Sequence, residues 1–427
     1  MINIAILLIS ILIYASFGFT NLIYILFSAL TTFFAAKNLN DKNKKLILAL
    51  TIIANIGILV FMKTYFYAEN FGIDTSNIIV PIGVSYYTLQ VISYLIDVYK
   101  GKYEPQKNLL KYLMYVIYIP YLIIGPINRY DDISETLYAK KHWDTNRILN
   151  GLIRILWGLF KKLIIAGRIS IILSVITGNT TKYNGAYALL AVLLYSIQIY
   201  ADFSGGIDMV IGISKLFGIE VKENFDSPYL SENVKEFWRR WHIGLSSWLR
   251  DYVYIPLGGS RKGNIRTKIN VIITFILSGL WHGSNYILWG FIHGLLVVYS
   301  KFTTTKWKYV NRVINYLIVS ILWAFFIWPN TITALKMIGS IFTTFNYGEL
   351  FTNLLNLNLD LANIIVLAIS VLILSIFGIK KHSIIEKIKN MKPETKFAII
   401  GTLGIIILVF GIYGIGFNVN EFIYSKF

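Results

Sequence analysis

The chain has 427 residues, of which 56% are hydrophobic and 15% are charged, and its mean hydropathy is +0.61. Soluble globular chains carry roughly 25% charged residues, so this composition excludes a soluble enzyme, a disordered chain and a coiled coil, and indicates a polytopic membrane protein. The net charge is +18, which in a membrane protein is typical of basic cytoplasmic loops, so no nucleic acid is expected as a partner. The absence of cysteine excludes disulfides, thiolate catalysis and Cys-ligated metal sites.

Apolar runs long enough to cross, or nearly cross, a bilayer recur along the chain. They lie near residues 2–15, 18–36, 46–62, 78–98, 112–127, 150–177, 185–217, 268–281, 286–304, 312–329, 361–379 and 396–416. Several are short or interrupted, so we expect roughly ten to thirteen membrane helices, some tilted or re-entrant. The first run lacks the basic segment of a cleavable signal, and we expect it to be retained.

Lysine-rich connections predict the orientation. They lie at residues 37–45, 100–111 and 380–392. Because short basic loops face the cytoplasm, we expect the loop 63–77 and the C-terminal tail, which follows the run at 396–416, to lie outside. The sequence shows no repeat, linker or low-complexity tract. We therefore predict one integral membrane domain over residues 1–427.

A polar interval at residues 218–267 interrupts the apolar pattern. Within it, apolar and aromatic residues and one histidine recur at three- and four-residue steps: Trp238, then Trp241 and His242, then Leu245, then Trp248 and Leu249. This spacing predicts one amphipathic helix over residues 234–250. Tryptophan suits the membrane interface, so a helix that only anchors the protein is one explanation. His242 lies on the apolar stripe, where a structural histidine is more common than a catalytic one.

Two further histidines lie beside tryptophans and glycines. Ser278-Gly279-Leu280-Trp281-His282-Gly283 ends one apolar run, and Trp289-Gly290-Phe291-Ile292-His293-Gly294 follows it. Ionisable residues at membrane depth usually line a cavity or pair with a partner, while helix packing explains the glycines equally well. Three of the five histidines fall within 52 positions. This clustering predicts a histidine-centred site.

Several known chemistries are excluded by inspection of the sequence. Residues 258–264 are rich in glycine but lack the Gly-Lys-Ser/Thr ending of a phosphate loop. There is no Gly-x-Ser-x-Gly elbow and no histidine followed five positions later by aspartate. There is also no His-Glu-x-x-His, so no metal is expected. Acid–base chemistry within the membrane remains.

Several blocks of the sequence carry a resemblance to known proteins. They are Pro81-Ile82-Gly83-Val84-Ser85, Ile124-Gly125-Pro126-Ile127, residues 198–206, residues 224–229, Phe237-Trp238-Arg239-Arg240-Trp241-His242, Tyr254-Ile255-Pro256-Leu257-Gly258-Gly259 and Gly279-Leu280-Trp281-His282-Gly283. These blocks resemble the membrane-bound O-acyltransferase family. They span residues 80–295, the predicted family core. The block at Tyr254 is most similar to the bacterial branch that contains the membrane subunits of alginate and peptidoglycan O-acetyltransferases.

The resemblance implies an all-α fold, in which a ring of helices with interfacial and re-entrant segments surrounds a funnel that reaches the cytoplasm. It implies that His282 is the catalytic histidine and His242 the second active-site histidine. Trp238 would line the tunnel between them, and Trp241, Trp281 and His293 would support the site.

The implied activity is transfer of an acetyl group from cytosolic acetyl-CoA across the membrane, for O-acetylation of an extracellular or cell-wall polysaccharide. Attack by a hydroxyl needs a base of near-neutral pKa, so we expect His282 to be the general base. His242 would orient the thioester or stabilise the oxyanion. A covalent acyl-histidine relay stays open.

No cofactor is expected besides the acyl-CoA donor, whose negative charge suits the basic inner loops. The resemblance also implies a multi-pass protein of a bacterial cell membrane, embedded in the lipid bilayer. A separate extracytoplasmic acyltransferase is the implied protein partner, and the C-terminal tail is its expected docking site.

Three alternatives stay open. D-alanyl transfer to teichoic acids uses related blocks, a transporter of a cell-envelope precursor would also bury polar residues, and a membrane scaffold would need no chemistry. No clear pair of half-repeats supports a transporter, and the motif blocks disfavour a scaffold.

Overall fold

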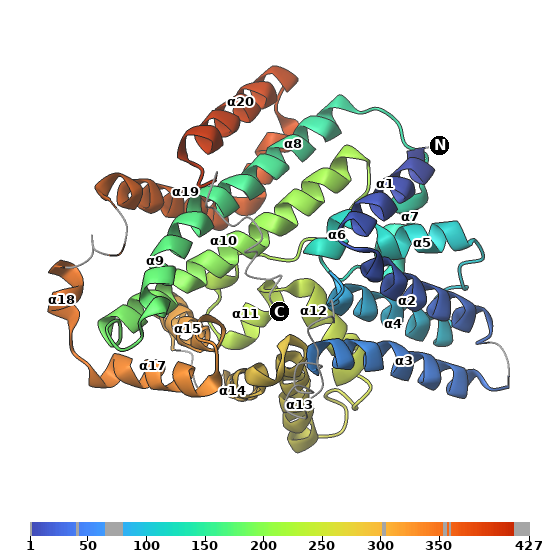
Figure 1. The fold of residues 1–427 in the computed structure, drawn as a ribbon, viewed down its shortest axis with the longest axis horizontal. Helices are drawn as coiled ribbons and strands as arrows, with labels where there is room; N and C mark the ends of the chain where they lie inside the picture. Colours follow the sequence, from blue (N-terminus) through green and yellow to red (C-terminus); the bar gives the residue numbers. More distant parts are fainter. Residues whose placement is uncertain are drawn as a thin grey trace. The chain divides into compact units, whose positions relative to one another are not determined.

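The structure is a computed structural model that describes residues 2–39, 42–64, 80–300, 305–352, 357 and 360–413. Over these residues the regular structure consists of α-helices with short 3₁₀ and π turns, and it contains no strand (Figure 1). The prediction of an all-α membrane protein is therefore confirmed. Most of the predicted loop 63–77 and the C-terminal tail from residue 414 lie outside the described residues.

The chain divides into two compact units. Unit 1 comprises Met1–Asp144 with Ile213–Lys222, and unit 2 comprises Thr145–Gly212 with Glu223–Phe427. All six predicted site residues belong to unit 2. That residues 1–427 form one domain, with a core at 80–295 and a ring of helices around a funnel, stays a prediction.

Unit 1 is built around α4, a helix that is buried on almost every side. Its helices are α1 (Ile2–Ser16), α2 (Phe19–Lys37), α3 (Lys44–Thr64), α4 (Val84–Tyr99), α5 (Leu109–Ile117), α6 (Ile119–Ile123) and α7 (Tyr130–Tyr138). Gln90 on α4 donates through Nε2 to the carbonyl oxygen of Tyr115 at 2.8 Å. The hydroxyls of Thr32 and Tyr112 lie 2.7 Å apart. Such pairs satisfy polar groups that no water reaches.

The first part of unit 2 is a helical stretch packed along a long helix. The stretch comprises α8 (Thr145–Leu159), the π-helix η2 (Phe160–Ala166) and α9 (Gly167–Gly178), and the long helix is α10 (Ala186–Leu216). A Cβ on Gly158 would lie 2.5 Å from the carbonyl oxygen of Gly205. Glycine therefore lets the two backbones approach closely, as small residues do between membrane helices.

The remaining helices of unit 2 carry the polar interval and the C-terminal third. They are η3 (Pro228–Leu230), α11 (Val234–Arg240), α12 (Ile243–Leu249), η4 (Arg250–Tyr254), α13 (Asn264–His282), η5 (Ser284–Tyr286), α14 (Ile287–Val298), α15 (Lys308–Leu322), α16 (Ala324–Ile327), α17 (Thr331–Thr343), α18 (Tyr347–Thr352), α19 (Leu361–Asn390) and α20 (Pro393–Phe410). In Figure 1, α13 and α14 lie side by side, and α20 lies beside α8.

Six helices within the described residues are long and apolar enough to cross a membrane. They are Phe19–Lys37, Lys44–Thr64, Ala186–Leu216, Lys308–Ile327, Leu361–Asn390 and Pro393–Phe410, with shorter apolar helices at Asn3–Ser16, Ser284–Val298 and Thr331–Thr343. A multi-pass membrane protein is confirmed, and the larger expected number of spans stays a prediction. The helix at Thr331–Thr343 was not predicted, because it has only 13 residues.

The prediction of one amphipathic helix over residues 234–250 is wrong. The chain forms two short helices, α11 and α12, separated at Trp241 and His242. His242 has φ 45° and ψ 54°, which is the left-handed region and cannot continue a helix. The tryptophans of the predicted stripe are buried within unit 2, with Trp241 only 1% exposed. They are therefore core residues and do not form an interfacial anchor.

Candidate active site

The helices α13 and α14 carry His282 and His293 and pack tightly against one another. A Cβ on Gly279 would lie 2.3 Å from the carbonyl oxygen of Tyr286, and a Cβ on Gly290 would lie 2.2 Å from that of Phe275. Glycine is therefore required at both positions for close helix packing. This is one of the two explanations that the sequence leaves open for the glycines of the motif.

His282, the last residue of α13, lies in a cage of aromatic rings. Its ring centroid is 4.7 Å from that of Trp281, 5.5 Å from that of Phe326, 5.7 Å from that of Trp289 and 6.1 Å from that of Tyr286. These rings cross that of His282 at angles between 71° and 88°. The residue is 6% exposed. The cage leaves the imidazole little contact with water.

His293 on α14 is held by a hydrogen bond from Trp238 on α11. The indole Nε1 of Trp238 donates to His293 Nδ1 at 3.1 Å. An indole N–H only donates, so Nδ1 must be the acceptor and the neutral ring carries its proton on Nε2. His293 is fully buried. Its Nε2 has no hydrogen-bond partner within the described part of the chain.

His242 occupies the break between α11 and α12. Its ring meets the ring of Phe203 edge-on at a centroid distance of 4.9 Å, and its Nδ1 lies 3.4 Å from Oδ1 of Asn224. The residue is 1% exposed. Burial lowers the pKa of His242 to about 3, so the ring is neutral at physiological pH.

Ring contacts join five of the six predicted site residues into one group. The contacts form a chain in which each ring touches the next: His242, Trp281, His282, Trp289, His293 and Trp238. The sixth residue, Trp241, reaches the group through intermediate rings: it stacks on Phe237, which contacts Trp238, and it contacts Trp323, which contacts Trp289. Trp241 therefore serves the packing around the site.

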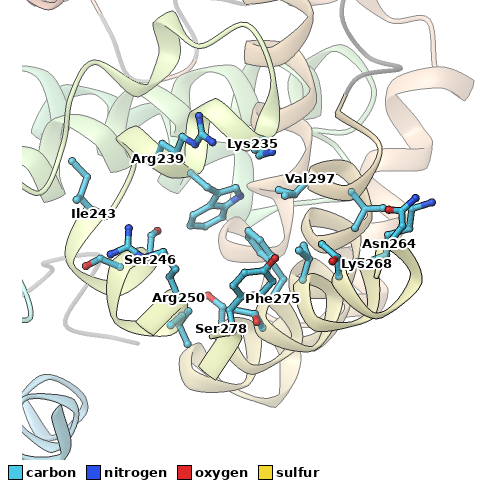
Figure 2. A pocket seen from close by; sticks show the side chains of 18 residues that line it. Lys235, Arg239, Ile243, Ser246, Arg250, Asn264, Lys268, Phe275, Ser278 and Val297 are labelled. Carbon is cyan, nitrogen blue, oxygen red and sulfur yellow. The ribbon is translucent and has the colours of Figure 1, made fainter. Parts of the chain in front are cut away.

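A cavity of about 580 Å³ opens beside this group of rings. Figure 2 shows Lys235 and Arg239 on one side of the cavity, Ser278 and Arg250 opposite, and Lys268 at a third side. Trp238 also lines it, as do Phe275 and Ser278 of α13. Ser278 lies four residues, about one helical turn, before His282. The cavity wall thus includes immediate neighbours of the buried histidines.

The wall of the cavity is cationic. Its charged residues are Lys235, Arg239, Arg250 and Lys268, and no carboxylate is among the described residues that line it. None of the three histidines is among those lining residues either. A cationic wall around an apolar floor suits an anionic ligand with an apolar or uncharged end.

A group of charges in unit 2 anchors the segment Glu223–Ser227, which follows α10. Lys381 Nζ donates to the carbonyl oxygen of Phe225 at 2.6 Å and lies 3.3 Å from Oε2 of Glu223. Arg154 contacts Glu223 at 2.8 Å and Asp208 at 2.6 Å. Although burial opposes its ionisation, the charges of Arg154 and Lys381 lower the pKa of Glu223 to about 2.

Sequence reasoning missed two residues of the site. Trp289 contacts both His282 and His293, and Asn224 contacts His242. The signal for Trp289 was its place in the second Trp-and-His block. Asn224 belongs to a recognised block, but nothing in its local sequence indicates that it reaches residue 242.

Comparisons with known proteins indicate the family of the chain. The model of the membrane-bound O-acyltransferase family matches residues 6–344. The chain is 34% identical to a probable alginate O-acetylase of Pseudomonas putida over 373 residues, which cover 81% of this chain and 74% of the relative. It is 35% identical to the peptidoglycan O-acetyltransferase of Helicobacter pylori over 338 residues, 69% of this chain and 64% of the relative. It is 31% identical to the teichoic acid D-alanyltransferase of Bacillus subtilis over 248 residues, 54% of this chain and 61% of the relative.

Proposed function

Because this chain belongs to the membrane-bound O-acyltransferase family and is an O-acyltransferase, we propose that it takes an acetyl group from cytosolic acetyl-CoA. The acetyl group is destined for hydroxyls of an extracytoplasmic polysaccharide. The protein acts in the cell membrane of a bacterium. A separate extracytoplasmic acyltransferase completes delivery to the polymer and docks at the C-terminal tail.

The choice of acetyl over D-alanyl rests on the relatives. Those named as alginate or peptidoglycan O-acetylating proteins are 34–37% identical over 65–81% of this chain. The two D-alanyltransferases are 28–31% identical over 54–56%. Alginate and peptidoglycan are both polysaccharides, which supports a polysaccharide acceptor. D-alanyl transfer stays the second candidate.

One observation carries the proposal: Trp238 lines the cationic cavity and also holds His293 in the group of rings that contains His282. The phosphates of acetyl-CoA would bind Lys235, Arg239 and Lys268, as anions do in a basic cleft. The thioester end would lie against the apolar floor at Trp238 and Phe275. From there the acetyl group would approach His282.

The proposed reaction needs one base. The acceptor oxygen attacks the thioester carbonyl carbon while His282 takes the hydroxyl proton. The tetrahedral intermediate then expels the thiolate of CoA, which receives that proton, and leaves an ester on the acceptor. The aromatic cage supports this role because it limits access of water, which would otherwise compete as the nucleophile.

The test is transfer of label from radioactive acetyl-CoA to an ester in membranes that contain the protein. His282→Ala should lower the rate by about 10² to 10⁴ at unchanged protein abundance. His142→Ala is the matched control, because that histidine is exposed and lies in unit 1. Normal turnover in His282→Ala would remove the residue from the mechanism.

Two further assays separate the alternatives. Wild-type membranes that transfer D-alanine but not acetyl would favour D-alanyl transfer. Reconstituted protein that moves a cell-envelope precursor without any acyl donor would favour a transporter.

A further inference from the structure

Asn224 is a fully buried residue that contacts the His242 ring and the backbone that follows it. Its backbone carbonyl oxygen accepts from the N–H of Ile243 at 3.0 Å. Its side-chain Oδ1 accepts from the N–H of Gly244 at 2.9 Å and lies 3.4 Å from His242 Nδ1. One residue therefore contacts the imidazole and the two peptide groups that follow it.

These contacts fix the position of a proton. A backbone N–H is always a donor, so the side-chain atom that faces Gly244 must be the amide oxygen. An amide oxygen only accepts hydrogen bonds, so His242 Nδ1 must be the donor toward it. The neutral imidazole carries a single proton, and Nε2 is then left with a lone pair.

The backbone at His242 needs such support. Among the described residues, His242 and Ser227 are the only non-glycine residues with positive φ, at 45° and 46°. Backbone strain of this kind persists where surrounding contacts over-determine it. The segment that holds Asn224 also pairs with the end of α11, since the N–H of Asp226 donates to the carbonyl oxygen of Arg240 at 2.9 Å.

The other face of this segment is anchored to α19. Ser227 Oγ donates to the carbonyl oxygen of Gly378 at 2.8 Å, and Lys381 donates to the carbonyl oxygen of Phe225 at 2.6 Å. Asn224 is thus fixed from two sides before any substrate binds. A rigid support of this kind holds a functional ring in one orientation.

We infer that Asn224 is a positioning residue, which sets His242 in the tautomer with the proton on Nδ1 and presents Nε2 as a hydrogen-bond acceptor. The inference rests on the proposed function only for its catalytic consequence. In that setting, neutral His242 accepts a hydrogen bond from a bound ligand through Nε2. It does not donate one to an oxyanion.

The tautomer itself is measured without any substrate. Protein labelled with ¹⁵N-histidine and placed in lipid bilayers has five histidines to resolve by solid-state NMR. The His242 resonances are those lost in His242→Gln. We expect a protonated Nδ1 and an unprotonated Nε2 in the wild-type protein. A wild-type His242 protonated on Nε2 would overturn the inference.

Variants of residue 224 test the cause. Asn224→Ala should release His242 from its single tautomer and lower kcat about tenfold, the effect of losing one hydrogen bond, with KM changed less than kcat. Asn224→Asp retains an oxygen acceptor, so it should keep the proton on Nδ1 and recover part of the rate. An Asn224→Ala protein with unchanged tautomer and unchanged kcat would overturn the inference.

Asn315→Ala is the matched control. Asn315 is also buried, and its side chain also bonds to the backbone, through donation of Nδ2 to the carbonyl oxygen of Ser231 at 3.1 Å, but no hydrogen bond joins it to His242. Its loss should leave the His242 tautomer unchanged. If the wild type has the expected tautomer but transfers no acetyl group, the proposed function fails and the assignment of Asn224 stands.

Discussion

The indole of Trp238 donates a hydrogen bond to Nδ1 of His293 across 3.1 Å, while Trp238 also forms part of the wall of the cationic cavity. The contact joins α11 to α14, two helices that are far apart in the sequence. It also sets His293 in the tautomer opposite to that inferred for His242. The two supporting histidines therefore differ in chemistry: Nε2 is a donor in His293 and an acceptor in His242.

Loss of this hydrogen bond should slow transfer. Trp238→Phe keeps an aromatic ring in the cavity wall but removes the N–H, so we expect kcat to fall about tenfold, equivalent to ~1.4 kcal/mol. Initial rates with acetyl-CoA in membranes measure the change. Trp143→Phe, at a tryptophan that is 80% exposed, is the control. Equal rates in the wild type and Trp238→Phe would show that the contact is only structural.

The buried His242 should make the protein sensitive to acid. Because burial lowers its pKa to about 3 from an ordinary 6.5, the unfolded chain binds a proton below pH 6.5 that the folded protein does not bind. The free energy of unfolding should therefore fall by up to about 1.4 kcal/mol per pH unit as the pH drops from 6.5 toward 3. His242→Gln lacks this contribution.

Melting temperatures in detergent measure that effect. The stability of the wild type relative to His242→Gln should decrease as the pH is lowered from about 7.5 to about 5. A difference that stays constant over this range would contradict the prediction, because it would mean that the folded protein accepts the imidazolium.

The positive charges of the cavity wall should strengthen binding of acetyl-CoA. Arg239→Gln removes one positive charge from the cavity, so we expect KM for acetyl-CoA to rise about three- to tenfold with little change in kcat. The salt dependence of KM should weaken as well. Lys262→Gln is the control, since Lys262 is exposed and does not line the cavity. An equal rise in KM in both variants would point to net charge alone.

Close packing of α13 on α14 should be sensitive to a single methyl group. Gly279→Ala would place a Cβ 2.3 Å from the carbonyl oxygen of Tyr286, and overpacking of this kind costs about 1–3 kcal/mol. We expect a lower melting temperature and less protein in the membrane. Gly401→Ala on α20 is the control, because nothing lies within 4 Å of its Cβ position. Equal stability of the two variants would contradict the packing argument.

The apolar helices were predictable from the sequence because hydropathy is a local property. The run expected at 18–36 is the helix Phe19–Lys37, and the run at 46–62 is Lys44–Thr64. The short helix α17 was missed because it falls below the length at which an apolar run indicates a span. Its only local start signal is the Asn330 side chain, which accepts from the N–H of Thr333.

The candidate site was only partly predictable. The helical, membrane-embedded character of the chain was predictable from the sequence, because composition and hydropathy are local properties. The clustering of His242, His282 and His293 was predictable as well, because the three histidines lie within 52 positions. The break between α11 and α12 depends on the fold, since Asn224 contacts the turn at His242 from 18 positions upstream. The tautomers assigned to His242 and His293 depend on the fold as well, because the hydrogen-bond partner of a buried ring comes from a distant segment that no local pattern identifies.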